Sequence, residues 1–190
     1  MIRNRSDYKY YLNADAHCLY TKKPSFLVKA KDDIWRYERV LRKCEYLLNT
    51  NKFPHPLMNP LYFYNKIKLR KLGYKLGFSI SENTFEEGLS IVHYGSIIVN
   101  PNAKIGKNCR IHSGVNIGSG ARGEGVPTIG NNVYIGPGAK IFGNIIIGDD
   151  IVIGANAVVN KSFIGGTIAG VPAHKVSEST SDDIIKRNEW

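Results

Sequence analysis

The chain has 190 residues, of which 43% are hydrophobic and 22% charged. This composition is ordinary for a globular protein, and the length fits one domain or a compact domain with a smaller appendage. No apolar run approaches the roughly 20 residues that span a bilayer, which excludes a helical membrane span. The net charge of +10 is concentrated in residues 1–80, which hold 17 Lys and Arg against 6 Asp and Glu.

The basic N-terminal part alone does not define a partner, because such a charge suits nucleic acid, a solvated helical surface or attraction of anionic ligands. No recognisable nucleic-acid module accompanies it, so we expect no nucleic-acid partner. The first residues are charged and no apolar stretch follows them. We therefore expect no signal peptide and a cytoplasmic protein.

Residues 1–78 are predicted to form an α-helical N-terminal subdomain. Residues 32–48 have apolar side chains at three- and four-residue steps, with acids at the start and bases after them, which predicts an amphipathic helix. Residues 52–60 contain prolines and asparagine and are predicted to be a connection. A second, basic and aromatic helix is expected over 61–72.

A six-residue period begins at Val99. Its main column is continuous apart from one gap of twelve residues, and its members are Val99, Ile105, Ile111, Ile117, Ile129, Ile135, Ile141, Ile147, Ile153 and Val159. A second apolar column, including Cys109, lies two residues before most of these positions. Glycine follows the main column at 106, 118, 130, 136, 148 and 154.

This period predicts a solenoid. Residues two apart on a short strand point to the same face, so both columns fill the inside of a coil, and three hexads close one triangular coil. The glycines are expected at the corners, where they would permit backbone angles that other residues avoid. The fold class is therefore mainly β, a left-handed parallel β-helix over residues 79–176 that follows the helical subdomain.

Two segments leave this pattern. The glycine-rich segment 118–128 interrupts a ladder that then resumes in phase, so it is predicted to be an extruded loop, where a binding contact would be placed. The alternative is a tolerated insertion. Residues 177–190 form a polar C-terminal tail, in which Ile184 and Ile185 indicate a short helix that could cover the last coil.

Residues 88–175 resemble the hexapeptide-repeat acyltransferases, and among them the serine acetyltransferase branch. The matching segments are GLSIVHYG (88–95), NAKIGKNCRIH (102–112), IGPGAKIFGN (135–144) and AGVPA (169–173). The resemblance implies transfer of an acetyl group from acetyl-CoA to a hydroxyl, with one histidine as general base and no metal. It also implies a homotrimer, with dimers of trimers as a further state, and clefts between subunits.

The resemblance implies a role for each matching residue. His93 corresponds to the catalytic base, and an imidazole has a pKa suited to removing a hydroxyl proton. Tyr94, His112 and Arg122 are the candidates for acceptor binding. The candidates for CoA binding are Gly118 and Ser119 at the loop, Gly136, Ala139 and Ala155 along the pantetheine arm, and Lys161, His174 and Lys175 at the phosphates.

The sequence departs from the branch around His93. Val92 stands where an acid precedes the catalytic histidine, Phe78 and Ser79 stand near the position of its aspartate partner, and Val126 replaces a further histidine. The expected acceptor is L-serine or a similar hydroxyl compound. A sugar hydroxyl of a capsule or polysaccharide and a catalytically inactive scaffold remain alternatives.

Three histidines have competing interpretations. His93 lies six residues before Val99, so an unbroken ladder would bury it in the core, whereas the catalytic role requires the first coil to slip out of phase. His112 follows Ile111 at a corner and is either a ligand contact or a corner residue. A zinc hydrolase would need three clustered imidazoles, and His93, His112 and the distant His174 do not supply them.

Overall fold

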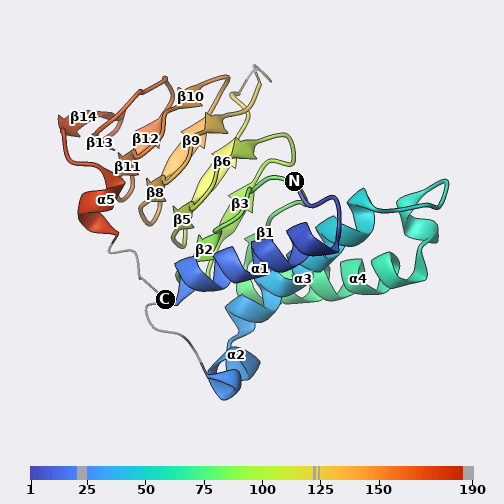
Figure 1. The fold of residues 1–190 in the computed structure, drawn as a ribbon. Coiled ribbons are helices and arrows are strands. Elements are labelled where there is room, and N and C mark those ends of the chain that lie inside the picture. The colour runs from blue at the N-terminus through green and yellow to red at the C-terminus, as the bar shows by residue number, and fades with distance from the viewer. Residues whose placement is uncertain (21–24, 122, 124, 186–190) are drawn as a thin grey trace.

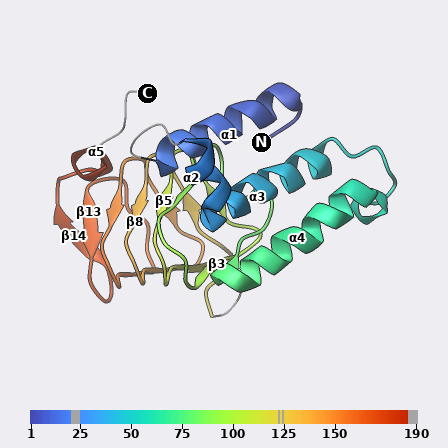
Figure 2. The ribbon, with the colours of Figure 1, turned by 90° about the horizontal axis from the view of Figure 1, so that it is seen from below.

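The computed structural model describes residues 1–20, 25–121, 123 and 125–185. A layer of helices at the N-terminal end lies beside one end of a three-sided solenoid of short strands, and the chain then runs along the solenoid away from the helices (Figure 1). Figure 2 shows the stacked coils edge-on, with α1, α3 and α4 gathered at the first coils.

The helical part contains α1 (Arg5–Leu19), α2 (Phe26–Lys31), α3 (Asp33–Asn49), a short 3-10 helix η1 (Pro56–Met58) and α4 (Pro60–Leu76). The two predicted helices are present. Asp32 caps α3 by accepting hydrogen bonds from two backbone amides. Asn59 and Pro60 begin α4, and Gly77 ends it with a left-handed φ of 82°. None of the described helices is long and apolar enough to cross a membrane.

The solenoid has short strands in three sheets. Sheet A contains β1 (Phe78–Ser79), β3 (Ile97–Val99), β6 (Asn116–Gly118), β9 (Lys140–Phe142) and β12 (Val158–Val159). Sheet B contains β4 (Lys104–Ile105), β7 (Thr128–Ile129) and β10 (Ile146–Ile147). Sheet C contains β2 (Ser90–Ile91), β5 (Arg110–Ile111), β8 (Tyr134–Ile135), β11 (Val152–Ile153), β13 (Thr167–Ala169) and β14 (His174–Ser177). All pairs are parallel except β13 with β14. The predicted parallel β-helix is therefore confirmed.

Both predicted apolar columns fill the interior. On sheet C, Ile111 pairs with Ile135 and Ile135 with Ile153, and all three are completely buried. The second column is buried as well, with Cys109 at 1% exposure. Successive residues within a strand point alternately inward and outward. In β10, Ile147 is 1% exposed while Ile146 beside it is 63% exposed.

The expected reason for the six corner glycines is wrong, because none of them has a left-handed φ. Five of them have a different role, namely Gly106, Gly130, Gly136, Gly148 and Gly154. They are required because a Cβ would collide with the next coil, as at Gly106, where it would lie 2.6 Å from the Gly130 carbonyl oxygen.

Left-handed backbone angles occur two residues after these glycine positions, and at the corners between sheets B and C they belong to asparagine and aspartate. Asn108, Asn132 and Asp150 have φ of 54°, 59° and 60°, which asparagine and aspartate tolerate better than most residues. Their side chains form a ladder, because Asn108 donates to Asn132 at 2.9 Å and Asn132 to Asp150 at 2.8 Å. The ladder ties successive coils together outside the apolar core.

Two corners contain extra residues. On sheet A, Asn116 pairs with Lys140, 24 positions later, whereas Lys140 pairs with Val158, 18 positions later. The six additional residues belong to the predicted extruded loop between β6 and β7. At the corner between β2 and β3, the step from the buried Ile91 to the buried Val99 is eight residues rather than six. The phase slip that the catalytic role of His93 requires is therefore present.

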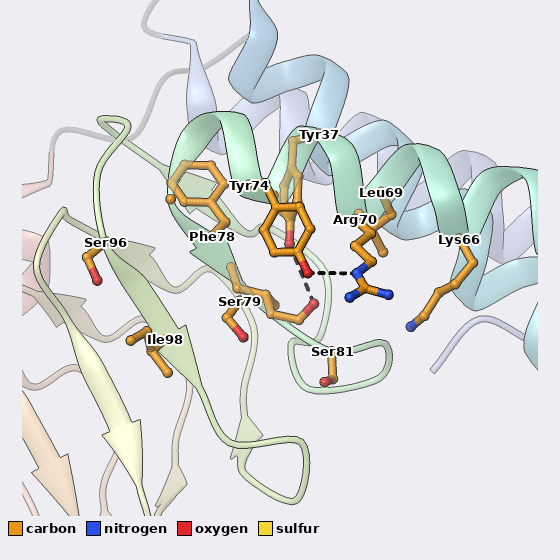
Figure 3. Close-up of a pocket in the computed structure, with 13 residues that line it drawn as sticks. Tyr37, Lys66, Leu69, Arg70, Tyr74, Phe78, Ser79, Ser81, Ser96 and Ile98 are labelled. Carbon is orange, nitrogen blue, oxygen red and sulfur yellow. Dashed lines mark hydrogen bonds between the residues drawn. The ribbon is translucent and has the colours of Figure 1, made fainter.

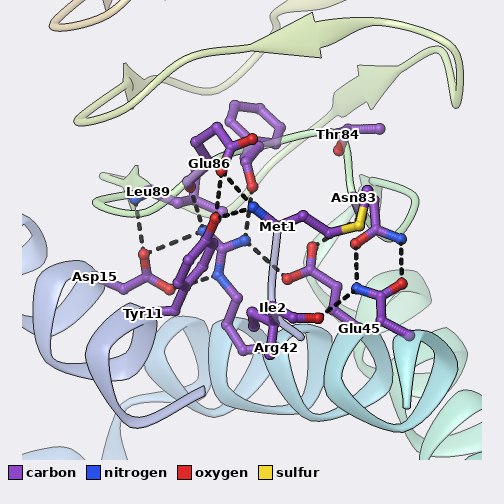
Figure 4. A network of polar contacts seen from close by, with 12 residues as sticks. Met1, Ile2, Tyr11, Asp15, Arg42, Glu45, Asn83, Thr84, Glu86 and Leu89 are labelled. Atoms are coloured by element: carbon purple, nitrogen blue, oxygen red, sulfur yellow. Dashed lines mark hydrogen bonds and ion pairs between the residues drawn. The ribbon is translucent and has the colours of Figure 1, made fainter. Parts of the chain in front are cut away.

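Buried charges join the helices to the first coil (Figure 4). Asp15 of α1 accepts from the amides of Gly88 and Leu89 at 2.8 and 2.9 Å. Arg42 of α3 pairs with Asp15 at 2.7 Å and with Glu45 at 2.9 Å, and it donates to the carbonyl oxygens of Phe85 and Glu86.

Two further buried carboxylates of α3 also accept hydrogen bonds from the first coil. Glu45 accepts from the amide of Asn83, and Glu38 from the amide of Ile91 at 3.1 Å. Burial, with Asp15 nearby, raises the pKa of Glu38 well above its usual range. We refer to Asp15, Glu38, Arg42 and Glu45 as the polar cap.

The far end of the solenoid is covered by the C-terminal segment. Strand β14 pairs antiparallel with β13, and the short helix α5 (Ser181–Ile184) begins where the Ser181 amide donates to the Asp150 carbonyl oxygen at 3.0 Å. Ile184 ends this helix, as its sequence indicated, but its side chain is 49% exposed. The last five residues of the predicted tail lie outside the described residues.

We expect the neighbouring residues Ile147 and Ile146 to respond very differently to truncation. Ile147→Ala leaves a cavity in the core and should lower the free energy of unfolding by about 2–5 kcal/mol. Ile146→Ala removes the same atoms from the exposed face of β10 and should change it by less than about 0.5 kcal/mol. Urea unfolding followed by circular dichroism measures both, and equal losses would contradict the inward assignment of Ile147.

Candidate functional site

His93 lies in the lengthened corner between β2 and β3, outside the core. Its side chain is exposed, as is that of Tyr94 with 74% exposure. The corner is attached to the helices, because the Gly95 amide donates to the Leu76 carbonyl oxygen at 2.8 Å, and Gly95 has a φ of 133°. The extra residues turn the imidazole out of the ladder.

His112 lies one coil above, beside His93. The centroids of the two imidazole rings are 6.0 Å apart, and the Tyr134 ring is 5.0 Å from that of His112 on its other side. Burial, with contributions from Arg110 and His93, lowers the pKa of His112 to about 4. Its Nε2 is buried and has no hydrogen-bond partner among the described residues. His112 is therefore a neutral imidazole with one polar atom unused.

The positions at which the serine acetyltransferase branch has acids near the catalytic histidine contain no acid here, and no other described carboxylate takes their place. Val92 is half-buried, Phe78 is buried in the core and Ser79 is exposed. No described carboxylate forms an ion pair or hydrogen bond with His93. Among the described residues, no group of three or more His, Cys, Asp or Glu could hold a metal ion.

A cavity of about 470 Å³ opens between α4 and the first strands of sheet A (Figure 3). Its polar groups include the hydroxyls of Ser79, Ser81 and Ser96 and the guanidinium of Arg70, which donates to the Tyr74 hydroxyl at 2.8 Å. None of the described residues that line it has a carboxylate. Ser96 follows the His93 corner, so this cavity adjoins the segment that carries His93.

A second cavity of about 470 Å³ lies on the Tyr94 side of the corner. Its two carboxylates are already engaged, because Asp32 caps α3 and accepts from the Tyr20 hydroxyl, and Asp33 pairs with Lys75 at 2.5 Å.

The structure separates the sequence-derived CoA candidates into two groups. Gly136 and the exposed Ala155 lie on the edge between sheets C and A, the edge that carries His93. Gly118, Ser119 and Lys161 lie on the edge between sheets A and B, on the opposite side of sheet A. One copy of the chain therefore does not bring His93 and the extruded loop together.

The remaining residues predicted from the sequence to bind CoA or the acceptor have less suitable positions or lie outside the described residues. Ala139 is completely buried, and its amide and carbonyl are both hydrogen-bonded within the solenoid, so it is a core residue and offers no group to a ligand. His174 and Lys175 are exposed on β14, and Lys175 pairs with Glu178 at 2.5 Å. Arg122 lies outside the described residues. Tyr134 was not among the candidates, because an aromatic residue in a hexad has no distinguishing sequence signal.

The lowered pKa of His112 predicts a specific pH dependence of stability. Between pH 6.5 and about 4, the unfolded chain binds a proton that the folded chain excludes, so the free energy of unfolding should fall as the pH is lowered through this interval. His112→Gln removes this contribution. Urea unfolding of both proteins across the interval should give a smaller pH slope for the variant, and identical slopes would contradict a neutral, buried His112.

The comparisons with known proteins agree with this architecture. The family model described as bacterial transferase hexapeptide (six repeats) matches residues 127–161. A search of curated protein sequences gives no significant match.

Three solved structures are similar over most of the chain. Serine acetyltransferase from Brucella abortus strain S19 has a TM-score of 0.72 at 24% identity, over 93% of this chain and 72% of that one. The Neisseria gonorrhoeae serine acetyltransferase has a TM-score of 0.73 at 23% identity, over 96% and 72%. The Brucella abortus enzyme in complex with coenzyme A has a TM-score of 0.72 at 24% identity, over 92% and 70%.

These matches extend through the N-terminal helices as well as the solenoid. The predicted resemblance to serine acetyltransferases is therefore confirmed at the level of the fold. The chain contains the bacterial transferase hexapeptide repeat and has a left-handed parallel β-helix with an α-helical N-terminal part.

Proposed function

We propose that this protein is an acetyl-CoA-dependent O-acetyltransferase in which His93 is the general base. The observation that carries the proposal is the exposed imidazole at a corner lengthened by two residues, in a fold shared with serine acetyltransferases. A core histidine would need no such departure from the six-residue period.

The chemistry follows from the position of His93. Its imidazole accepts the proton of the acceptor hydroxyl while the hydroxyl oxygen attacks the thioester carbonyl of acetyl-CoA. The tetrahedral species collapses, the carbon–sulfur bond breaks, and the imidazolium returns the proton to the leaving thiolate. No covalent bond to the protein forms in this sequence.

The edge that carries His93 offers room for an extended ligand. In the following coils, the positions equivalent to His93 are Ser113, Pro137 and Ala155, none of which has a long side chain. Such a row of short side chains suits the pantetheine arm of acetyl-CoA. His174 and Lys175 are exposed and could approach its phosphates from the same copy. Lys161 lies on the opposite edge of sheet A and could approach them only from a neighbouring subunit.

The second part of the site would come from a neighbouring subunit in a homotrimer. His93 and the loop that begins at Gly118 lie on opposite edges of sheet A in one copy. A heterologous, three-fold arrangement would bring the His93 edge of one copy against the loop edge of the next. A dimer of such trimers would be a further level of assembly.

Two acceptors follow from different observations. The fold favours L-serine, because one similar Neisseria gonorrhoeae structure is a complex with serine. The residues around His93 favour a sugar hydroxyl, because the adjoining cavity has serine hydroxyls, Tyr74 and Arg70 but no carboxylate to bind an α-ammonium group. We propose the sugar hydroxyl as the better match to this chain. Release of CoA thiol, measured with L-serine and with a panel of sugars and nucleotide sugars, tests the choice, and turnover with serine alone would overturn it.

We expect His93→Ala to lower kcat by about 100- to 10,000-fold, because the hydroxyl would lose its general base. The same assay gives the rate, and circular dichroism confirms folding. His55→Ala, an exposed histidine in the helical part, is the matched control and should keep full activity. Undiminished transfer by His93→Ala would remove the general-base role and leave the inactive-scaffold alternative in place.

A mixing experiment tests the shared site. Deleting residues 120–125 restores the six-residue step from Ile117 to Ile129 and removes the extruded loop. This deletion and His93→Ala should each be inactive alone. After co-refolding in equal amounts, random assembly leaves about one-quarter of the sites with both parts intact, so about one-quarter of wild-type activity should return. Absence of recovery would contradict a site formed between subunits.

A further inference from the structure

Helix α4 has an exposed apolar and aromatic face that nothing in the described chain covers. Its outward side chains include Phe63 at 50%, Tyr64 at 64% and Ile67 at 42% exposure. At 3.6 residues per turn, these three positions fall within about one-third of the helix circumference. We call these three residues the α4 outer face. Figure 2 shows α4 at the outer edge of the helical part, with α3 on its inner side.

The same helix is strongly basic. Its sequence, PLYFYNKIKLRKLGYKL, contains five Lys and Arg and no acid. Lys66 pairs with Glu82 and Lys75 with Asp33. Lys68, Arg70 and Lys71 have no carboxylate within 4.0 Å among the described residues. Lys68 and Lys71 are therefore uncompensated cations on the helix that carries the α4 outer face.

A basic cavity lies where α1, α3 and α4 meet. It has a volume of about 520 Å³ and is lined by Tyr8, Arg36, Arg39, Val40, Lys43, Asn65 and Lys68. None of its four cations forms an ion pair within the described part of the chain. Lys43 lies over the rings of Tyr8 and Tyr46, at 5.4 and 5.0 Å from their centroids. Four like charges around one hollow repel one another, and a bound anion would relieve that repulsion.

We propose that α4 and the basic cavity bind the surface of an anionic phospholipid bilayer. An apolar, aromatic stripe flanked by Lys and Arg is the pattern of a helix that lies in the membrane interface, with its apolar side chains among the acyl chains and its cations among the headgroups. The basic cavity receives a headgroup phosphate. This attachment is peripheral and is consistent with the absence of a membrane-spanning helix among the described residues.

Charge disfavours a second copy as the occupant of this face, and the apolar side chains disfavour a nucleic acid. Two copies meeting through their α4 outer faces would bring two sets of uncompensated cations together. A nucleic acid would satisfy the cations but would leave Phe63 and Ile67 against a polar phosphate backbone. An anionic bilayer satisfies both features of the helix.

Vesicle flotation of the full chain tests the proposal. We expect binding to vesicles of equal parts phosphatidylglycerol and phosphatidylcholine, weakening as salt is raised, and little binding to phosphatidylcholine alone. Hydrogen exchange of the unmodified protein should show protection of residues 61–75 when anionic vesicles are added. Equal binding to both vesicle types, no binding to either, or protection confined to other segments would overturn the proposal.

Two variants separate the parts of the surface. Arg39→Glu/Lys68→Glu should weaken vesicle binding about tenfold or more, because each cation near an anionic bilayer contributes about 1 kcal/mol. Phe63→Ser/Ile67→Ser keeps the charge and should weaken binding to a similar extent. Lys9→Glu/Lys104→Glu makes the same charge change elsewhere and should weaken it by less than about threefold.

Sedimentation and nucleic-acid binding assays complete the test. If the unmodified protein self-associates through α4 and Phe63→Ser/Ile67→Ser abolishes that association without altering vesicle binding, the face is a contact between copies and the proposal fails. It also fails if Arg39→Glu/Lys68→Glu affects only binding to RNA. Loss of vesicle binding in both α4 variants, with the Lys9→Glu/Lys104→Glu control retained, supports it.

Discussion

The first coil of a solenoid has no preceding coil to accept its backbone amides, and the polar cap supplies those acceptors. Asp15, Glu38 and Glu45 accept from the amides of the first coil, while Arg42 donates to its carbonyl oxygens. A buried amide left without a partner costs about 1–3 kcal/mol. The helices are therefore required as the starting edge of the β-helix, and their side chains replace the missing strand.

This cap also determines where the proposed catalytic base lies. Glu38 accepts a hydrogen bond from the amide of Ile91, two residues before His93. The Leu76 carbonyl oxygen, at the end of α4, accepts one from the amide of Gly95, two residues after His93. The corner is thus fixed on both sides by helices rather than by the regular ladder. An exposed loop residue with such supports has less conformational entropy to lose when it engages a substrate.

The solenoid could be predicted almost completely from sequence, because one six-residue period determines both which residues are buried and how coils stack. The helices α3 and α4 were predictable from apolar spacing and capping residues. Helix α1 was missed, although Asn4 followed by Asp7 is a capping signal, because its apolar residues do not form a clear stripe. The polar cap was also missed, since Glu38, Arg42 and Glu45 look like surface charges until the partner coil is known.

The site was only partly predictable for a similar reason. The sequence placed His93 and the extruded loop at breaks in the period, but it did not show that they occupy different edges of sheet A. The pairing of His112 with His93 depends on the register of β2 with β5, in which Ile91 lies beside Ile111. Such relationships between corners arise from coil stacking and have no local sequence pattern.

The six extra residues between β6 and β7 have an evolutionary consequence. They leave the strands on both sides in register, so the core does not depend on their number or identity. Insertions and deletions there would alter what the proposed subunit cleft admits without altering the packing that keeps the protein folded. A solenoid of this kind can therefore acquire new acceptors by changing loop length alone.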